Sequence, residues 1–371
     1  VSLVDGHTDW REVFREASWE EALEVAAKPL RALKEQFGLK ALAGFGSAKG
    51  SNEEAYLFQK LVRTGFGSNN VDHCTRLCHA SSVSALLEGV GSGAVSNPVR
   101  DVEHSELIIV IGSNPTNNHP VAATWMKNAA QRGTRIVLMD PRVTDIGRHA
   151  WRVLPFKADT DVALLNAMLH VIVIDGLCDE AFLRERADQV AELKAHVQAF
   201  SPEAMAPVCG IPAETIREVA LAYASSKASM ILWGMGVSQH VHGTDNVRCL
   251  IALASLTGQI GRPGTGLHPL RGQNNVQGAS DAGLIPMMYP NYQRVVREDA
   301  HAQFEAMWGT PLGREAGLTV ELDGGFARYF NRRRRRHAID VAPFGHTACV
   351  ADGGFADGSA DGEVPEDGDA K

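Results

Sequence analysis

Residues 106–140 read ELIIVIGSNPTNNHPVAATWMKNAAQRGTRIVLMD, and this stretch decides the fold class. The apolar run from Leu107 predicts a buried strand, which a polar turn ends. VAATWMKNAAQRG predicts a helix that ends at Gly133, and TRIVLMD predicts a second strand ending in Asp140. Two such strands joined by a helix form a βαβ unit with parallel strands. The sequence therefore predicts an α/β protein with doubly wound, mostly parallel Rossmann-like sheets.

The same alternation of short apolar runs and helical periodicity extends to both sides of this unit. We expect strands at 40–48, 151–156 and 229–234, and helices at 19–36, 53–64, 160–174, 179–187 and 212–226. By contrast, residues 261–277 are dense in Gly, Pro, Asn and Gln, which predicts a long surface loop. Long ordered loops on a rigid α/β scaffold often carry function.

Composition limits the class of protein. With 371 residues, 44% of them hydrophobic and 22% charged, the chain can bury one large core or two ordinary ones. A net charge of −8 argues against a nucleic-acid partner, because phosphate binding needs a broad cationic face. The six cysteines have no framework spacing, which favours a reducing compartment, the cytoplasm. No apolar run approaches the ~20 residues of a membrane-spanning helix, so no membrane segment is expected.

The turn Gly112-Ser113-Asn114 could bind a phosphate, because it follows a strand and precedes a helix N-terminus. Asp140, at the end of the next strand, could accept hydrogen bonds from a ribose or a guanine. The turn lacks the G-x-G-x-x-G pattern, so an ordinary turn without a ligand stays an equal alternative.

Residues 72–79 read DHCTRLCH, and short spacing of thiols and imidazoles is compatible with zinc. A soft metal bound by one thiolate and a buried thiol beside a surface histidine are the alternatives. Arg271, in LRGQNNVQG, could bind a small carboxylate through its planar fork or could brace its own loop. Four other histidines have no matching partner in sequence and are expected to be structural or solvated: His119, His170, His240 and His242.

Six motifs then occur in one order: DHCTRLCHASSV, IGSNPTNNHPV, MDPR, KADTDVALLNAM, LWGMGVSQ and PLRGQNNVQGASD. Together they resemble the catalytic (alpha) subunits of the molybdopterin formate dehydrogenases, over residues 10–318. The resemblance implies oxidation of formate to carbon dioxide at molybdenum or tungsten held by bis-molybdopterin guanine dinucleotide. It also implies electron transfer to partner subunits that carry iron–sulfur clusters or flavin and that can be NAD-linked.

The resemblance assigns roles to individual residues. Cys78 corresponds to the metal ligand, His79 to an adjacent acid/base or positioning group, and Arg271 to the formate anchor. The expected cofactor-binding residues are Gly112, Ser113, Asn114, Asn118, Asp140, Arg142, Asp159, Asp161, Met235, Gln239, Gly272 and Gln273. Among them, the residues from Gly112 to Arg142 correspond to a cradle for one guanine dinucleotide, and Asp159 and Asp161 correspond to nucleoside contacts. The last four residues line the pterin.

The sequence also departs from the family pattern. Ligands for the family's four-iron four-sulfur cluster are absent before Cys74, and nothing after residue 320 matches the C-terminal pterin-binding domain. We therefore expect a central fragment: 1–100 as a partial α/β domain with the Cys-His metal loop, 101–265 as the dinucleotide-binding domain, and 266–320 as the active-site loop and return to the first domain. The tail, 321–371, is expected to be disordered or translated out of frame. A non-catalytic remnant or pterin-binding module is the alternative function.

Overall fold

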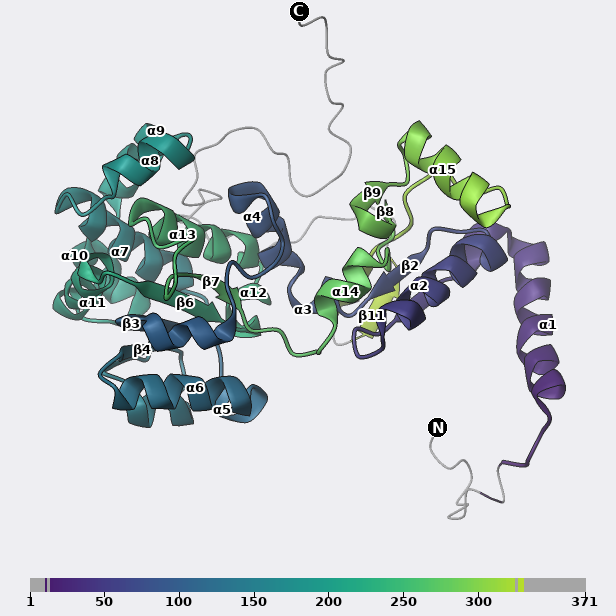
Figure 1. Ribbon diagram of the computed structural model, residues 1–371, viewed down its shortest axis with the longest axis horizontal. Helices are drawn as coiled ribbons and strands as arrows, with labels where there is room; N and C mark the ends of the chain where they lie inside the picture. The colour runs from purple at the N-terminus through teal and green to yellow at the C-terminus, as the bar shows by residue number, and fades with distance from the viewer. Residues whose placement is uncertain (1–10, 12–13, 324–325, 330–371) are drawn as a thin grey trace, which may run out of the picture. The chain divides into compact units, whose positions relative to one another are not determined.

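The computed structural model of the chain describes residue 11, residues 14–323 and residues 326–329. The chain forms two compact units (Figure 1). The first combines the segment that ends at Cys74 with the segment that begins at Asn275, and the second runs from Thr75 to Asn274. We expected boundaries near residues 100 and 265. The difference arises because helix α4 (Ala80–Val90) packs inside the second unit, where Gly89 faces Ile251.

The second unit is built on one five-stranded sheet in the order β5-β4-β3-β6-β7. Every neighbouring pair of strands is parallel. The strands are β3 (Leu107–Ile111), β4 (Arg135–Met139), β5 (Arg152–Leu154), β6 (Ser229–Trp233) and β7 (Gly266–Pro269). The strand order reverses between β3 and β6, which is where doubly wound proteins bind their ligands. The predicted α/β fold is confirmed.

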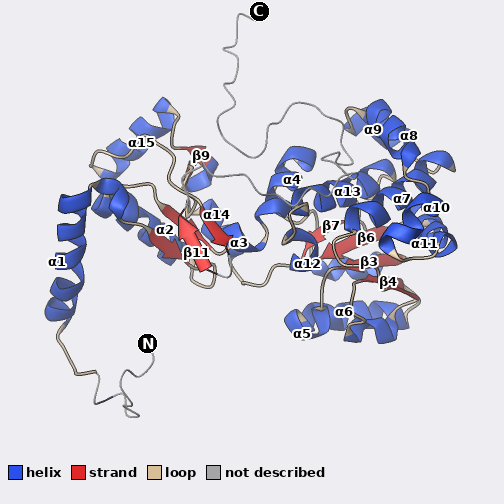
Figure 2. Ribbon diagram, turned by 180° about the vertical axis from the view of Figure 1, so that it is seen from behind, coloured by secondary structure: helices blue, strands red, loops and turns tan. Residues whose placement is uncertain are grey.

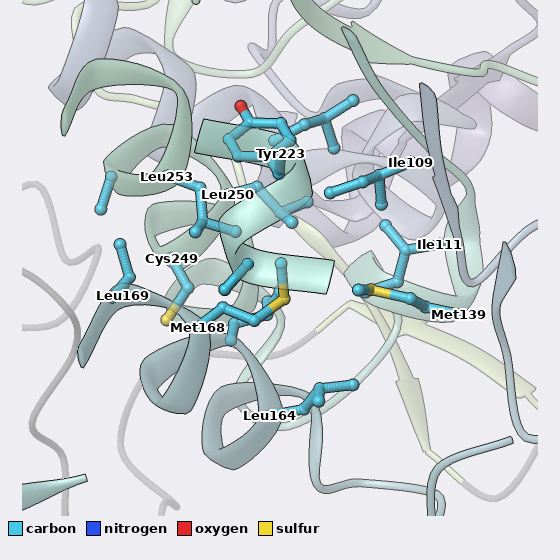
Figure 3. Close-up of a cluster of buried hydrophobic side chains, with 14 of the residues drawn as sticks. Ile109, Ile111, Met139, Leu164, Met168, Leu169, Tyr223, Cys249, Leu250 and Leu253 are labelled. Atoms are coloured by element: carbon cyan, nitrogen blue, oxygen red, sulfur yellow. The ribbon is translucent and has the colours of Figure 1, made fainter. Parts of the chain in front are cut away.

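Helices cover both faces of this sheet (Figure 2). Side chains of β3 alternate: Leu107, Ile109 and Ile111 belong to one buried cluster, and Ile108 and Val110 to another. A parallel sheet buried on both faces needs such a continuous apolar run. The larger cluster lies under α7 (Asp161–Ile174), α10 (Pro202–Cys209), α11 (Ala213–Ser225) and α13 (Gly243–Leu256), and Figure 3 shows its centre. The opposite face carries α5 (Pro115–Asn118) and α6 (Pro120–Gln131).

The expected long surface loop at 261–277 is wrong in its centre, because β7 lies there and all four of its residues are buried. The glycine that opens β7 has a φ of 133°, and a Cβ at Gly266 would lie 2.2 Å from Asn97 Oδ1. Glycine is therefore required by close packing at this position rather than by a turn.

Shorter elements complete the second unit. They are α3 (Thr75–Cys78), α8 (Glu180–Arg186), α9 (Val190–His196) and α12 (Met235–Ser238).

The first unit has a small sheet in which β1 (Gly44–Gly46) pairs in parallel with β2 (Val71–His73). The strand expected at 40–48 is shorter than predicted, because a 3₁₀ helix occupies Leu39–Ala41. The helix expected at 53–64 is α2 (Asn52–Lys60), which continues as a π-helix, Leu61–Phe66. The remaining elements are α1 (Trp19–Phe37), α14 (Val276–Asp281), β8 (Met288–Tyr289), β9 (Gln293–Arg294), α15 (Glu298–Trp308), β10 (Val320–Asp323) and β11 (Phe326–Tyr329).

One arginine connects the two sequence segments of the first unit. The side chain of Arg63 is 1% exposed, and its guanidinium lies 5.0 Å from the ring centre of Tyr289. Its five hydrogen-bond acceptors are the side-chain oxygens of Gln59 and Asn69 and the main-chain carbonyls of Gly283, Ile285 and Met288. All five acceptors are uncharged, and burial lowers the pKa of Arg63 to about 10.

The expected disordered tail falls mostly outside the described residues. Within it the structure describes β11 and most of β10, which pair antiparallel. None of the described helices combines the length and apolar character needed to cross a membrane.

Candidate functional site

Cys78 lies in the second unit at the end of α3, and its side chain is mostly buried, with the residue 7% exposed. Its Sγ lies 3.3 Å from Sδ of Met235, the first residue of α12. Because α12 follows β6 directly, the thiol is positioned near the carboxyl end of the sheet's central strands. Met235 itself is exposed, and a thiol beside a thioether is a soft donor set.

His79 follows Cys78 and is fully buried. Its Nε2 lies 3.2 Å from the carbonyl oxygen of Leu270, so this nitrogen carries the proton. Nδ1 must then accept a hydroxyl proton, and Oγ of Ser238 and Oγ of Ser82 lie 3.1 and 3.3 Å away. The indole N–H of Trp233 donates to Ser82 at 2.9 Å. Burial, and then the charge of Arg271, lower the pKa of His79 to about 4, so the imidazole is neutral.

Arg271 lies just beyond β7. The N–H of Leu270 donates to the carbonyl of Trp233 at 2.7 Å, which extends the β6–β7 pairing by one residue. The half-buried Arg271 donates through Nη2 to the carbonyl of Gly93. The structure therefore brings Cys78, His79 and Arg271 to one end of the sheet.

Two more imidazoles, those of His119 and His268, lie near His79 and Arg271. His268, on β7, is 7% exposed, and burial lowers its pKa to about 4. Burial also lowers the pKa of His119, which precedes α6. The charge of His119 acts on both His79 and His268. His119 is therefore half-buried near the site. His268 was not predicted, because a single histidine in a Gly/Pro-rich segment carries no signal.

The turn after β3 and the turn after β6 lie where the strand order reverses, and their main chains are in contact. Gly112 follows β3 with a φ of 56°, and the N–H of Gly236 donates to its carbonyl at 3.0 Å. A Cβ at Gly112 would lie 2.7 Å from the main-chain nitrogen of Val237. The predicted phosphate-binding turn is thus packed directly against the turn that carries Met235.

We expect Gly112→Ala to lower the free energy of unfolding by about 3 kcal/mol, because the methyl group would meet main-chain atoms. Gly176→Ala is the matched control: its φ is 67°, but nothing lies within 4 Å of its Cβ position. It should cost about 1 kcal/mol from backbone strain alone. Urea unfolding measures both changes, and equal losses for the two variants would contradict a steric role for Gly112.

A group of carboxylates follows β4 and β5. Asp140 is 8% exposed, and its Oδ1 accepts from the N–H of Arg142 at 2.8 Å. Asp161, the first residue of α7, is 2% exposed, and its Oδ1 has no hydrogen-bond partner among the described residues. Burial raises the pKa of Asp161 from 3.8 to about 6, and neighbouring Asp159 and Asp140 add to the increase. An unsatisfied buried carboxylate is costly, which indicates a site prepared for a hydrogen-bond donor.

Asp161→Asn should stabilise the ligand-free chain by about 2 kcal/mol at pH 8 and by much less at pH 4. The folded-state pKa is the higher one, so wild-type stability is complete below about pH 4 and falls as the pH rises through about 6. Thermal unfolding across this range measures the change. Asp175→Asn, at the exposed end of α7, is the control with no expected effect. A pH-independent change at Asp161 would contradict this account.

The remaining predicted residues divide between the two groups. Near the thiol, Gln239 donates to the carbonyl of Leu77 at 2.5 Å, Gly272 is exposed, and the buried Oε1 of Gln273 has no partner among the described residues. Near the carboxylates, Asp159 has a φ of 65° and lies 3.2 Å from Nδ1 of His240. The other predicted residues follow β3 and β4: the buried Ser113 and the half-buried Asn114 after β3, the exposed Asn118 at the end of α5, and the exposed Arg142 after β4.

The zinc alternative finds no support in the described residues. Within them, no three His, Cys, Asp or Glu side chains gather to hold a metal ion. Both nitrogens of His79 already have protein partners. Of the histidines expected to be structural, His170 lies 2.9 Å from the carbonyl of Val197. His240 lies 2.7 Å from the carbonyl of Gly236, and His242 precedes α13.

These features fit a large cofactor with a soft metal at one end and a polar nucleoside at the other. The thiol of Cys78 suits the metal. The unsatisfied oxygens of Gln273 and Asp161 suit donors on the cofactor. Between the residues around Cys78 and the carboxylates around Asp161 lie the turns of Gly112 and Gly236, which present main chain and no side chains.

Comparisons with known proteins agree with this geometry. The molybdopterin oxidoreductase family model matches residues 10–323. Formate dehydrogenase H of Escherichia coli (strain K12) is 42% identical over 79% of this chain and 41% of its own length. The F420-dependent formate dehydrogenase subunit alpha of Methanocaldococcus jannaschii is 40% identical over 83% of this chain and 45% of its own length. The chain thus spans less than half the length of these curated relatives.

A solved structure is similar in fold. Acetylene hydratase from Pelobacter acetylenicus has a TM-score of 0.62 at 24% identity, over 68% of this chain and 34% of that one. At this identity the likeness concerns the fold alone. The family match over most of the chain and the relatives at 40% identity or more carry the assignment. The chain belongs to the molybdopterin oxidoreductase family, whose members use a molybdenum or tungsten pterin cofactor.

Proposed function

We propose that this chain is part of the catalytic subunit of a formate dehydrogenase that oxidises formate to carbon dioxide. The convergence of Cys78, His79 and Arg271 at one end of the sheet carries the proposal. The names of the relatives that match most of the chain support formate as the substrate. The cofactor proposed is molybdenum or tungsten held by bis-molybdopterin guanine dinucleotide.

When bound, this cofactor supplies a centre that takes up two electrons. Cys78 would hold its metal, because a thiolate is the soft ligand that such a centre prefers. Arg271 would bind the carboxylate of formate, since a guanidinium presents parallel N–H donors to two oxygens. Because Arg271 is half-buried, the ion pair between its guanidinium and formate would be screened less than one in bulk water. Carbon dioxide has no charge, so the product leaves Arg271 more easily than the substrate does.

His79 acts as a positioning group in this proposal. Its N–H donates to Leu270, the residue before Arg271, and its other nitrogen accepts from the serine pair. A neutral, fully hydrogen-bonded imidazole therefore ties the residue after Cys78 to the residue before Arg271. This arrangement favours a role for His79 in setting the positions of Cys78 and Arg271 over a role in proton exchange.

The second group of residues would hold one guanine dinucleotide. The buried Asp161 and Asp140 offer acceptors to guanine or ribose donors, and Asp159 adds a third carboxylate. The turn Gly112-Ser113-Asn114, with Asn118 and Arg142, would hold the phosphates. Met235, Gln239, Gly272 and Gln273 would line the pterin nearer to Cys78.

Electrons would pass to an iron–sulfur chain and on to partner subunits with flavin or iron–sulfur clusters. Relatives described as alpha subunits support the existence of such partners. A cytoplasmic location is proposed with this scheme.

The test is to purify the chain from a host that makes the cofactor and to measure metal and pterin per chain. Formate-dependent reduction of a dye is measured on the same sample, with nitrate-dependent dye oxidation as the specificity control. We expect close to one metal per chain and activity with formate alone. A folded chain that holds neither metal nor pterin would overturn the proposal in favour of a non-catalytic remnant.

A further inference from the structure

We propose that residues 93–97 form a positioning strap that sets where the Arg271 guanidinium lies, and that Gly93 is the residue on which the strap depends. The strap connects α4 to the segment before β3 and runs beside β7. The inference deepens the proposed function, because it rests on Arg271 as the formate anchor. Neither the motifs nor the spacing of the sequence indicates it.

The strap is hydrogen-bonded along β7, the last strand of the sheet. The N–H of Ser96 donates to the carbonyl of Leu267 at 3.1 Å, and the N–H of Leu267 donates to Oγ of Ser96 at 2.9 Å. These contacts satisfy main-chain groups that an edge strand would otherwise leave open. These bonds fix the register between the strap and β7 at Leu267, which is four residues before Arg271.

Gly93 places the other end of the strap on α4. A Cβ at Gly93 would lie 2.9 Å from Cγ1 of Val83, so a side chain here would force Val83 or the main chain to move. Val83 lies in the first turn of α4, just after His79. The carbonyl of Gly93, which accepts from Nη2 of Arg271, is thereby fixed to the helix that begins beside Cys78.

Arg271 is consequently held at two points. His79 donates to the carbonyl just before it in the chain, and Gly93 accepts from the far end of its side chain. A carbonyl at one end of a planar guanidinium restricts rotation of the plane, which sets the direction of the remaining N–H donors. Segment 78–97 therefore carries the candidate metal ligand and also the acceptor that orients the formate anchor.

The test compares Gly93→Ala with the double variant Gly93→Ala/Val83→Ala, in which the 2.9 Å contact is removed. We expect Gly93→Ala to raise KM for formate on the order of tenfold with a smaller change in kcat, because a displaced anchor weakens substrate binding. Amide hydrogen exchange of the peptides that contain Ser96 and Leu267 should accelerate in the same variant. The double variant should return both readouts toward wild type, while Val83→Ala alone should leave them unchanged.

Unchanged KM and exchange in Gly93→Ala would overturn the strap. So would a double variant that is no better than Gly93→Ala, because the clash with Val83 would then not be the cause. Failure of the proposed function looks different: the wild-type chain would show no formate activity. In that case the exchange rates of Ser96 and Leu267 still decide whether Gly93 holds the strap on β7.

Discussion

Cys78→Ala is expected to lose formate-dependent dye reduction by far more than a hundredfold while the chain stays folded. Groups that only orient a metal ligand cost roughly 10- to 100-fold when removed, and the ligand itself should cost more. Alanine offers no lone pair to a metal. The mostly buried position beside Met235 tolerates the smaller side chain, so the thermal unfolding midpoint should change little. Metal content and initial rates of dye reduction measure the effect.

Cys178→Ala provides the matched control. Cys178 is a half-buried free thiol in the loop between α7 and α8, so the same chemical change is made outside the proposed site. It should keep both metal and activity. Full activity in Cys78→Ala would refute the metal-ligand role, and equal losses in the two variants would point to a general effect of removing a thiol.

Arg63→Ala should destabilise the first unit by about 5 kcal/mol. The change removes a buried cation and leaves three main-chain carbonyls and two side-chain oxygens without their donor. Each buried acceptor without a donor lowers the free energy of unfolding by roughly 1–3 kcal/mol, and water that enters the vacated space offsets part of this loss. Hydrogen exchange of peptides from 56–66 and 283–289 measures the loss, and peptides from β3 and β6 should keep wild-type protection.

Two further variants sharpen that result. Arg63→Lys retains the charge but has three donors instead of five, so we expect an intermediate loss. Arg31→Ala on α1 removes an exposed arginine whose partner, Glu24, is also exposed, and should change stability by less than about 0.5 kcal/mol. Wild-type exchange in Arg63→Ala would show that water or repacking replaces the guanidinium.

The sequence predicted elements where periodicity and burial agree. The strands β3, β4 and β6 have five residues each, of which at least four are apolar and buried, which is why their positions were predicted closely. β7 was not predicted because its sequence, GLHP, begins with Gly and ends with Pro, which are typical of turns, and contains only one aliphatic residue. Its strand character comes from pairing with β6 and with Ser96, which local sequence does not encode.

The site could be predicted only in part. Short spacing around Cys78 left zinc, a single soft metal and an inert thiol open, and resemblance rather than chemistry chose among them. Apart from Ser82, the partners of His79 are Ser238 and Leu270, which lie 159 and 191 positions away in the sequence, and no sequence pattern connects them. The role assigned to Gly93 depends on a contact with Val83 that only the folded chain reveals.

The discontinuity of the first unit affects the order in which the chain can fold during synthesis. The second unit is one uninterrupted segment and can close as soon as Asn274 has left the ribosome. The first unit must wait until the carbonyls of Gly283, Ile285 and Met288 reach Arg63. At ~5–20 residues per second, the roughly 200 intervening residues impose a delay on the order of 10–40 seconds. Throughout that interval the guanidinium of Arg63 stays hydrated, and the early segment is a natural client for chaperones.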